Sequence, residues 1–430
     1  MAREQVRVIG FSTAEPAAVW AIARDFCGLW HPLIATMVAE RDAQGHLIRA
    51  FTAKGEGKTY RERLTYFSDT DMTLAYTHVE GIEGAEHYDA RLSVSRAEKG
   101  GSAILMSASL SARADRARDI ASGTEAIFKD AVAALAAAAE AGPPQIPAAP
   151  LPKAAPIYSQ MIDALPRLAL EVTDGRDGPL CLLLHGIGGA RQNWQRQLAA
   201  IGHQTRAAAL DLRGYGDSTL GPKQSTVDDY CADILRVAQV LGAEKLILVG
   251  LSYGSWIATS FAMRHPDRLV GLVLSGGCTG MSEAGASERE AFRVSREVPL
   301  NAGQVPADFA PAVVNVIAGP NANSEVRAEL LASMAAIPAS TYRDALICFT
   351  NPLEKFDFAR LTMPVLMMTG EFDRLAPPAE IRGVAERIFD ASKTPDVQFE
   401  VIPGVGHVCN VEGAEAYTRH LQRFVARLTA

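Results

Sequence analysis

The pattern of apolar and polar positions divides this chain into two parts of different kinds. Up to about residue 140, short segments of alternating or strand-favouring residues are separated by turns, and a long Ala-rich segment ends the series. We expect a short helix over residues 17–26, where Pro16 suits a helix start, and a long helix over 114–140. Strands followed by one long helix predict an antiparallel sheet that grips the helix, an α+β layout. The expected strands cover residues 6–12, 47–53, 59–67, 73–79, 88–95 and 103–109.

The second part contains short, almost wholly apolar runs that are separated by helical stretches. Runs of this kind are typical of parallel strands that are buried on both faces. Strands that alternate with helices imply βαβ crossovers, and the fold class predicted here is therefore an α/β doubly wound sheet. The expected strands cover residues 180–184, 205–210, 245–249, 269–274, 364–369 and 397–402.

Two further segments complete the predicted organisation. Repeated proline and alanine from residue 141 to 156 indicate a semi-rigid linker, because proline removes backbone donors and favours extended structure. We therefore expect domains at 1–140 and 164–430 with a linker at 141–163. The alternation of strands and helices stops between residues 274 and 364, and an excursion of that length predicts a helical cap inserted at about 278–360.

Composition narrows the classes of protein. The chain has 430 residues, 48% of them hydrophobic and 21% charged, which is ordinary globular usage for two domains. A formal net charge of −7 argues against non-specific binding to nucleic acid or to an anionic membrane. The first residues of the chain are charged and resemble no signal peptide, and the apolar runs are too short to cross a bilayer. The six cysteines show no C-x-x-C spacing. We expect a cytoplasmic protein that needs no metal and no organic cofactor.

The strongest chemical signal is the pentapeptide Gly250-Leu-Ser-Tyr-Gly254. It follows an expected strand and precedes an expected helix, which is the setting that the G-x-S-x-G motif requires. Small residues let the turn pack tightly, so that the hydroxyl of Ser252 is exposed beside a helix N-terminus that stabilises negative charge. The sequence therefore predicts Ser252 as a catalytic nucleophile.

A serine nucleophile needs a base and an acid, and both are expected at later strand ends. His407 follows the last apolar strand, and Asp373 follows the strand before it. The order nucleophile, acid, histidine fits this motif. Glu371 competes with Asp373 but lies nearer the strand, where solvation explains it as well. We predict Asp373 as the group that orients His407 and stabilises its charged form.

Donors for an oxyanion are expected from His185-Gly-Ile-Gly-Gly189, which follows the first strongly apolar strand of the second part. Its small residues allow backbone amides to face a cavity, so the amides of Ile187 and Tyr253 are the predicted pair. This segment does not match the dinucleotide-binding motif G-x-G-x-x-G, because Arg191 occupies the position of the last glycine of that motif. Asp211, in the next strand-end loop, is interpreted as structural.

With these motifs in order, residues 164–430 resemble the α/β-hydrolase superfamily. The segments Val249-Gly-Leu-Ser-Tyr-Gly, Asp211-Leu-Arg-Gly-Tyr-Gly-Asp-Ser and Ile402-Pro-Gly-Val-Gly-His look like its enol-lactonase, esterase and cofactor-free haloperoxidase branch. The resemblance implies the same roles for Ser252, Asp373, His407, Ile187 and Tyr253. The chain departs from that branch at Tyr253, usually Met or Leu, where the phenol should alter the pocket.

The first part resembles the SRPBCC superfamily, the helix-grip fold of polyketide cyclases and START-like lipid carriers. The resemblance rests on Ala17-Ala-Val-Trp, Asp25-Phe-Cys-Gly-Leu-Trp-His-Pro-Leu and Tyr60-Arg-Glu-Arg-Leu before Thr73-Leu-Ala-Tyr. It implies a cavity between sheet and helix for an apolar ligand. The side chains considered for its lining are Trp30, His31, Tyr60, Glu62 and Tyr76.

The expected function is hydrolysis of a small, apolar to moderately polar carboxylic ester or lactone through an acyl-enzyme. Dehalogenase and epoxide-hydrolase relatives use an aspartate nucleophile, whereas position 252 is serine. Hydrolysis of a carbon–carbon bond in a β-diketone-like substrate is an alternative, although such enzymes commonly have asparagine where this chain has Leu251. A ligand-binding protein on a hydrolase scaffold is a second alternative. The first part is expected to present substrate or to mediate assembly into a homo-oligomer.

Overall fold

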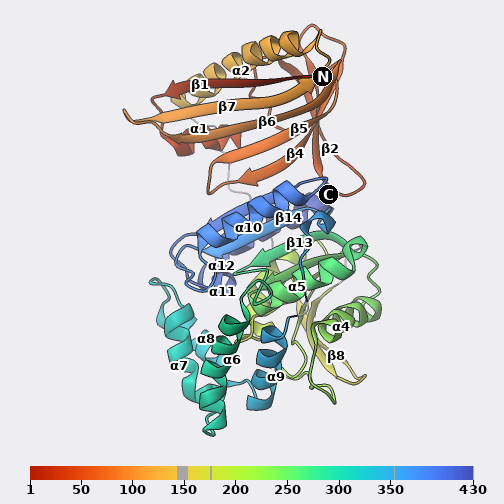
Figure 1. Ribbon diagram of the computed structural model, residues 1–430, viewed down its shortest axis with the longest axis vertical. Helices are drawn as coiled ribbons and strands as arrows, with labels where there is room; N and C mark the ends of the chain where they lie inside the picture. Colours follow the sequence, from red (N-terminus) through yellow and green to blue (C-terminus); the bar gives the residue numbers. More distant parts are fainter. Residues whose placement is uncertain (143–153, 175–176, 353, 430) are drawn as a thin grey trace. The chain divides into compact units, whose positions relative to one another are not determined.

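The computed structural model describes residues 1–142, 154–174, 177–352 and 354–429. The chain forms two compact units, the first made of residues 1–150 and 394–399 and the second of 151–393 and 400–430 (Figure 1). Each unit is described below by itself. No helix in the described ranges has both the length and the apolar character needed to cross a bilayer.

The first unit is an antiparallel sheet with two helices. Helix α2 packs on strands β1 and β7. Along β7 buried and less buried residues alternate, as expected for a sheet with one covered face. The α+β layout is therefore confirmed. In sheet order the strands are β1 (Ala2–Ser12), β7 (Ser102–Ala112), β6 (Ala85–Arg96), β5 (Thr73–Glu80), β4 (Thr59–Ser68), β3 (Leu47–Ala53) and β2 (Ile34–Arg41), and the helices are α1 (Pro16–Ala23) and α2 (Ala117–Glu140).

The second unit contains a mixed sheet in the order expected of a doubly wound fold. Neighbouring strands from β14 to β11 pair in parallel, and β9 and β8 continue the sheet in antiparallel fashion. The order is β15 (Val397–Ile402, of which residues 400–402 belong to this unit), β14 (Val365–Gly370), β13 (Leu269–Ser275), β12 (Leu246–Leu251), β10 (Leu180–Leu184), β11 (Ala207–Leu210), β9 (Leu168–Thr173) and β8 (Ile157–Ile162).

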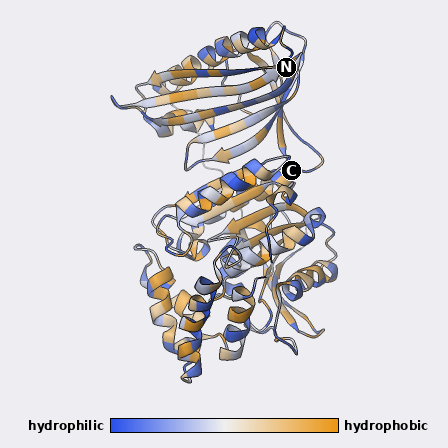
Figure 2. Cartoon of the chain, in the orientation of Figure 1, coloured by the Kyte–Doolittle hydropathy of each residue, from blue (hydrophilic) through white to orange (hydrophobic). Residues whose placement is uncertain are grey.

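Burial on both faces of the sheet explains why the sequences of these strands are almost wholly apolar. Every residue of β10, β11, β12 and β14 is buried, since helices cover both faces of the sheet. The covering helices show one hydrophobic and one hydrophilic side (Figure 2), as α10 does with its buried Ile381, Val384, Ala385 and Ile388. These helices are α3 (Gln195–Ile201), α4 (Val227–Val240), α5 (Tyr253–Arg264), α10 (Pro378–Ala391) and α12 (Ala414–Thr429).

Between β13 and β14 the chain forms the predicted helical insert. It contains α6 (Ala286–Asn301), α7 (Pro306–Ile317), α8 (Ser324–Ala335) and α9 (Ala339–Thr350). We call these four helices the cap. Helix α9 is tied to the loop after β11, because the hydroxyl of Thr341 donates to the carbonyl oxygen of Gly214 at 2.8 Å.

The predicted linker is wrong at its C-terminal end. Residues 157–162, expected as linker, form β8, the edge strand that pairs with β9. The strand is short and lies between Pro156 and Pro166, and this proline-rich setting concealed its weak strand pattern. Residues 143–153 of the expected linker lie outside the described residues.

Candidate active site

The geometry of the site begins with the backbone of Ser252, at the turn between β12 and α5. Its φ of 55° and ψ of −114° are strained for a residue with a side chain. Its amide donates to the carbonyl oxygen of Ser275 at 2.7 Å, which holds the turn. A side chain on Gly254 would collide with the carbonyl oxygen of Leu184, and one on Gly250 would collide with the carbonyl oxygen of Gly254. The motif's glycines are thus needed for close packing.

His407 lies in the loop between β15 and helix α11 (Cys409–Glu412), and its side chain reaches Ser252. The Nε2 atom is 2.8 Å from the Oγ of Ser252, and Nδ1 is 2.9 and 3.0 Å from the carboxylate oxygens of Asp373. With an Nδ1 proton donated to Asp373, Nε2 is left as the acceptor for the serine proton. The structure thus brings these three predicted residues together in one hydrogen-bonded chain.

Asp373 is buried in the turn after β14. One carboxylate oxygen accepts the amides of Leu375 and Ala376 at 2.8 and 2.9 Å. Burial alone would raise the pKa of this carboxyl group, but the hydrogen bond and charge of His407, followed by the two amides, outweigh it and lower the pKa. Asp373 is therefore held as a carboxylate beside the imidazole.

Glu371, the competing acid, has a different partner. Its carboxylate accepts the amide of Gly404 at 2.9 Å, and its own amide donates to the carbonyl oxygen of Ile402 at 2.9 Å. These bonds tie the turn after β14 to the loop that carries His407. Glu371 thus positions a loop and does not contact the imidazole.

The predicted oxyanion donors flank the serine. A Cβ placed on Gly186 would lie 3.3 Å from the Cβ of Ser252, so the loop of residues 185–189 runs directly beside the nucleophile. Tyr215 donates its hydroxyl proton to the carbonyl oxygen of Ile187 at 3.1 Å and so fixes this peptide group. Within the described residues, neither the Ile187 amide nor the Tyr253 amide donates a hydrogen bond to the protein.

Two buried polar side chains support that loop from behind. His185 accepts the amide of Leu212 on Nε2 at 3.1 Å, which leaves Nδ1 to donate to the carbonyl oxygen of Gly186 at 2.8 Å. Burial lowers the pKa of His185, in keeping with a neutral ring. Asp211, fully buried, accepts the amides of Arg191 and Asp217 at 2.9 and 3.2 Å and pairs with the Arg191 guanidinium. The geometry of both side chains is that of structural groups.

The side chain of Tyr253 belongs to an aromatic cluster under the cap. Its ring centroid lies 5.6 Å from those of Tyr230 and Trp256 and 5.5 Å from that of Phe349 in α9. Tyr253 is fully buried by these contacts. The phenol thus packs among other aromatic side chains, and its predicted effect on the pocket stays a prediction. Sequence reasoning did not identify Phe349, because an aromatic residue in a predicted cap helix carries no specific signal.

A cavity of ≈ 540 Å³ lies between the loop of residues 185–189 and cap helix α8. Asn193 holds its wall, since the side-chain amide nitrogen donates to the Ser333 hydroxyl at 2.9 Å and the amide oxygen accepts the Ala190 amide at 3.0 Å. Of residues 185–189, Gly189 lines this cavity, whereas Ser252, Asp373 and His407 are absent from its lining. Its lining includes Gly189, Ala190, Asn193, Arg196, Tyr215, Asp217, Glu329, Ser333 and Ile337.

In the first unit, the predicted lining residues do not form one cluster. Glu62 is buried and accepts a hydrogen bond from Arg49 at 2.6 Å, and the Arg49 guanidinium lies 4.5 Å from the ring centroid of Tyr76. Trp30 donates to the backbone of Asp25, and His31 approaches the backbone of Ile127. Tyr60 donates to Glu56 in an exposed pair. Arg49 was not predicted, since a charged residue within a strand pattern gives no sign of burial.

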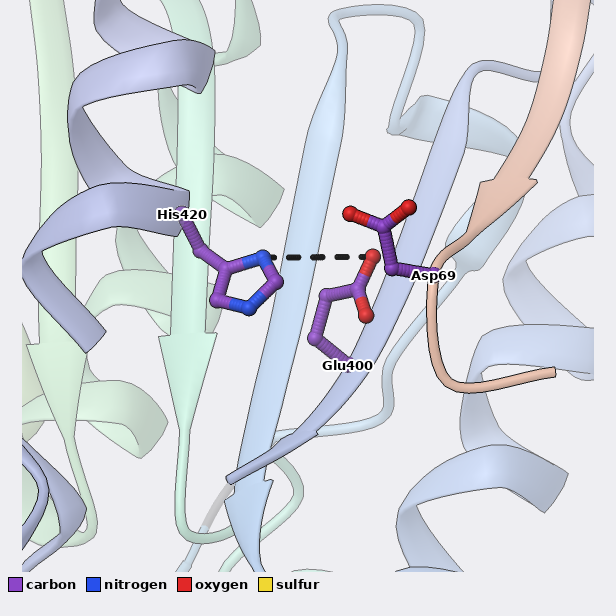
Figure 3. Close-up of side chains that lie close together, drawn as sticks. All are labelled: Asp69, Glu400 and His420. Carbon is purple, nitrogen blue, oxygen red and sulfur yellow. Dashed lines mark ion pairs between the residues drawn. The ribbon is translucent and has the colours of Figure 1, made fainter. Parts of the chain in front are cut away.

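One more titratable pair of the second unit lies on β15 and α12. The Nδ1 atom of His420 is 4.0 Å from a carboxylate oxygen of Glu400, as the dashed line in Figure 3 marks. Glu400 is buried and His420 is partly exposed. No described hydrogen bond joins this pair to Ser252, Asp373 or His407. We assign the pair no part in the candidate active site.

Comparison with known protein families agrees with this architecture. The family model described as alpha/beta hydrolase fold matches residues 179–414, more than half of the chain. The model described as polyketide cyclase / dehydrase and lipid transport matches residues 6–140.

Among individual relatives, epoxide hydrolase B of Mycobacterium tuberculosis is 37% identical over 101 residues, which are 23% of this chain and 28% of that enzyme. The chain spans about a third or less of the length of the first epoxide hydrolases that it matches. A putative carbamate hydrolase of Shigella flexneri is 26% identical over 271 residues, covering 61% of this chain and 97% of the relative.

Solved structures with a similar fold include a thermophilic esterase from Thermogutta terrifontis, with a TM-score of 0.56 and 26% identity over 64% of this chain and 100% of the esterase. An enol-lactonase from Burkholderia xenovorans has a TM-score of 0.50 and 20% identity over 63% of this chain and 99% of that protein, a likeness of fold alone. The resemblance first seen in the sequence motifs is thus shown over most of the second unit. The chain belongs to the α/β-hydrolase fold family.

Proposed function

We propose that the protein hydrolyses a carboxylic ester or lactone, with Ser252 as nucleophile, His407 as general base and acid, and Asp373 as the group that orients the imidazole. The observation that carries the proposal is the hydrogen-bonded chain from Asp373 through His407 to Ser252. In such a chain the base is within reach of the proton that it removes, and its second nitrogen is held by a carboxylate.

In the first half-reaction, His407 Nε2 takes the proton of Ser252 as Oγ bonds to the carbonyl carbon. The carbonyl oxygen becomes an oxyanion, which the amides of Ile187 and Tyr253 stabilise by hydrogen bonds. The bond from carbon to the leaving oxygen then breaks, and His407 returns its proton to that oxygen. The product is an alcohol, or the free hydroxyl end of an opened lactone, together with an acyl-enzyme.

The second half-reaction repeats the chemistry with water. His407 removes a proton from water, the hydroxide adds to the acyl carbon, and the bond to Oγ breaks as the serine regains its proton. Asp373 stays ionised throughout and stabilises the imidazolium that forms in each half-reaction. The lowered pKa of Asp373 supports this role, because a carboxylate is needed to hold the Nδ1 proton.

Other hydrolytic reactions receive less support. The epoxide hydrolases among the relatives match over a short stretch, and residue 252 is serine where such enzymes use aspartate. A carbamate remains within reach of the same mechanism, because its carbonyl carbon can also accept Oγ, and the putative carbamate hydrolase matches over nearly its whole length. We therefore propose an acyl substrate and place the ester or lactone first.

The test is covalent labelling followed by turnover. A fluorophosphonate should label the folded protein at Ser252 and leave Ser252→Ala unlabelled, and wild type should hydrolyse 4-nitrophenyl butyrate or dihydrocoumarin while Ser252→Ala does not. Carbamate and β-diketone substrates, followed by product analysis, distinguish the reaction types. Labelling of both proteins alike would overturn the assignment of the nucleophile.

The alternative to an enzymatic function is that of a ligand-binding protein on a hydrolase scaffold. Such a protein would retain its biological response in Ser252→Ala and would release no product from any acyl substrate. A wild-type protein that binds but never turns over an ester, lactone or carbamate would favour that reading.

A further inference from the structure

The feature that leads beyond the proposed function is the carboxylate of Glu412, the last residue of helix α11. One of its oxygens, Oε2, accepts two backbone amides, that of Gly319 at 2.7 Å and that of Gly406 at 3.1 Å. Gly406 immediately precedes His407, and Gly319 lies in the connection between cap helices α7 and α8. A single oxygen atom thus joins the loop of the proposed base to the cap.

The backbones of these two segments also meet directly. The amide of His407 donates to the carbonyl oxygen of Ile317, the last residue of α7, at 2.8 Å. A side chain on Gly319 would collide with the amide nitrogen of Gly406, and one on Gly406 would collide with the carbonyl oxygen of Ile317. The loop of the proposed base therefore lies in close backbone contact with the cap connection, and the position of one segment constrains the other.

The peptide group that precedes His407 is held at both of its polar atoms. Its oxygen, which belongs to Val405, accepts the amide of Phe372 at 2.9 Å, and Phe372 lies in the turn that carries the proposed acid. Its nitrogen, which belongs to Gly406, donates to Glu412. Loss of the Glu412 side chain would therefore leave this peptide group fixed on the side of the acid and free on the side of the cap.

Burial gives the two hydrogen bonds of Glu412 their weight. Gly319 and Gly406 are both buried, and Glu412 is half-buried. A buried amide without an acceptor is costly, so loss of the carboxylate would favour a rearranged loop in which both amides find other partners. Burial also raises the pKa of the Glu412 carboxyl group, an effect that the amides of Gly319 and Gly406 offset only in part. These surroundings require an acceptor oxygen and do not favour a negative charge.

From these contacts we infer that Glu412 is a positioning residue, which fixes the loop of His407 to the cap through one acceptor oxygen. The bridge holds the imidazole where it reaches both Ser252 and Asp373. The property that residue 412 supplies is the reach of an acceptor oxygen, and its charge is not needed. This inference rests on the proposed function, because it takes His407 as the base.

Three substitutions at this position separate reach from charge. Glu412→Gln keeps the length of the side chain and one acceptor oxygen but has no charge. Glu412→Asp keeps the charge but is shorter by one methylene group, so that its oxygens no longer reach both amides. Glu412→Ala has neither property. If the bridge is what positions His407, Glu412→Gln resembles wild type and Glu412→Asp resembles Glu412→Ala.

The kinetic test measures kcat and KM for 4-nitrophenyl butyrate at 25 °C. A misplacement of a catalytic group by about 1 Å costs on the order of 100-fold in rate. We therefore expect kcat to fall about 10- to 100-fold in Glu412→Asp and Glu412→Ala and to stay within about threefold of wild type in Glu412→Gln. KM should change less than about threefold in all three variants, because the carboxylate bonds to backbone amides and leaves the binding of substrate to other residues.

Glu415→Ala is the matched control, since it removes a neighbouring carboxylate that is exposed and pairs with Arg419 at 2.9 Å. Its kcat should equal that of wild type, and circular dichroism shows that all the proteins compared are folded. A Glu412→Ala variant with the wild-type kcat would overturn the inference. A Glu412→Gln variant as impaired as Glu412→Ala, with Glu412→Asp active, would overturn it as well, because the charge and not the bridge would then be what matters.

A spectroscopic measurement on the full chain separates this inference from the proposed function. The proton between His407 and Asp373 should give a low-field proton resonance, which Asp373→Asn identifies by weakening the acceptor. We expect wild type, Glu412→Gln and Glu415→Ala to keep this resonance, and Glu412→Asp and Glu412→Ala to lose it.

Amide exchange, followed in protein with isotope-labelled glycine, should be at least about tenfold faster at Gly319 and Gly406 in Glu412→Asp and Glu412→Ala than in wild type. A resonance and exchange rates that are alike in wild type and Glu412→Ala overturn the positioning role, whether or not the protein hydrolyses an ester. The expected dependence on Glu412, in a protein that hydrolyses no ester, lactone or carbamate, overturns the proposed function only.

Discussion

The substitution Asp211→Asn tests whether the second buried carboxylate near the site is structural. Asp211 has no exposed surface, accepts two backbone amides and pairs with Arg191, which is itself buried. Removing one partner of a buried pair costs about 3–5 kcal/mol, because the other charge is left uncompensated. Arg191 keeps a second partner in Asp217 at 2.7 Å, so we expect the lower end, about 3 kcal/mol.

For a domain of this size, about 3 kcal/mol lowers the melting temperature by roughly 6–12 °C. Scanning calorimetry measures that shift, and initial rates with 4-nitrophenyl butyrate at 25 °C measure kcat. Since Asp211 does not contact Ser252 or His407, we expect kcat of the folded variant within about tenfold of wild type. Asp217→Asn is the control, because Asp217 is largely exposed and its loss should cost about 1 kcal/mol or less. A loss of kcat above about 10³-fold with an unchanged melting temperature would refute this reasoning and make Asp211 a participant in the reaction.

Three further predictions concern the candidate active site. Asp373→Asn should lower kcat in the esterase assay about 10⁴-fold without unfolding the protein, since the amide favours the wrong imidazole tautomer. In the same assay, kcat of the control Glu371→Gln should stay within about threefold of the wild-type value. Tyr215→Phe removes the hydrogen bond to the Ile187 carbonyl oxygen, and we expect kcat to fall about tenfold with KM nearly constant. Equal kcat values for this variant and wild type would show that the phenol does not hold the predicted oxyanion loop. Burial lowers the pKa of His185 below 6.5, so its contribution to stability is complete above pH 6.5 and is lost as pH falls toward the lowered pKa. Urea titrations at pH 7, 6 and 5 should therefore show a smaller decline for His185→Gln than for wild type.

The hydrogen-bonded chain of Ser252, His407 and Asp373 was predictable from sequence because each residue follows a strand in a recognisable local setting. Parallel strands bring their carboxyl ends to one edge of the sheet, so residues 252, 373 and 407 converge although they are far apart in the chain. The structure agrees with the choice of Asp373 over Glu371, because the carboxylate of Asp373 is the one that contacts the imidazole.

The missed elements have weak local patterns. Strand β2 shows little alternation of buried and exposed residues and pairs only with β3 among the described strands, so its sequence carries no clear period of two. Tyr215 was not identified from sequence for another reason. Its hydrogen-bond partner Ile187 lies 28 residues away, and no short-range pattern encodes such a contact.

The backbone of Ser252 has a consequence for how this fold can change. A residue with a side chain in that conformation costs on the order of 1–3 kcal/mol, which glycine would largely avoid apart from its own greater loss of entropy on folding. Selection for stability alone would therefore favour glycine at this turn, and selection for turnover would favour serine. At the proposed nucleophile, the stability of the fold and the proposed chemistry therefore favour different residues.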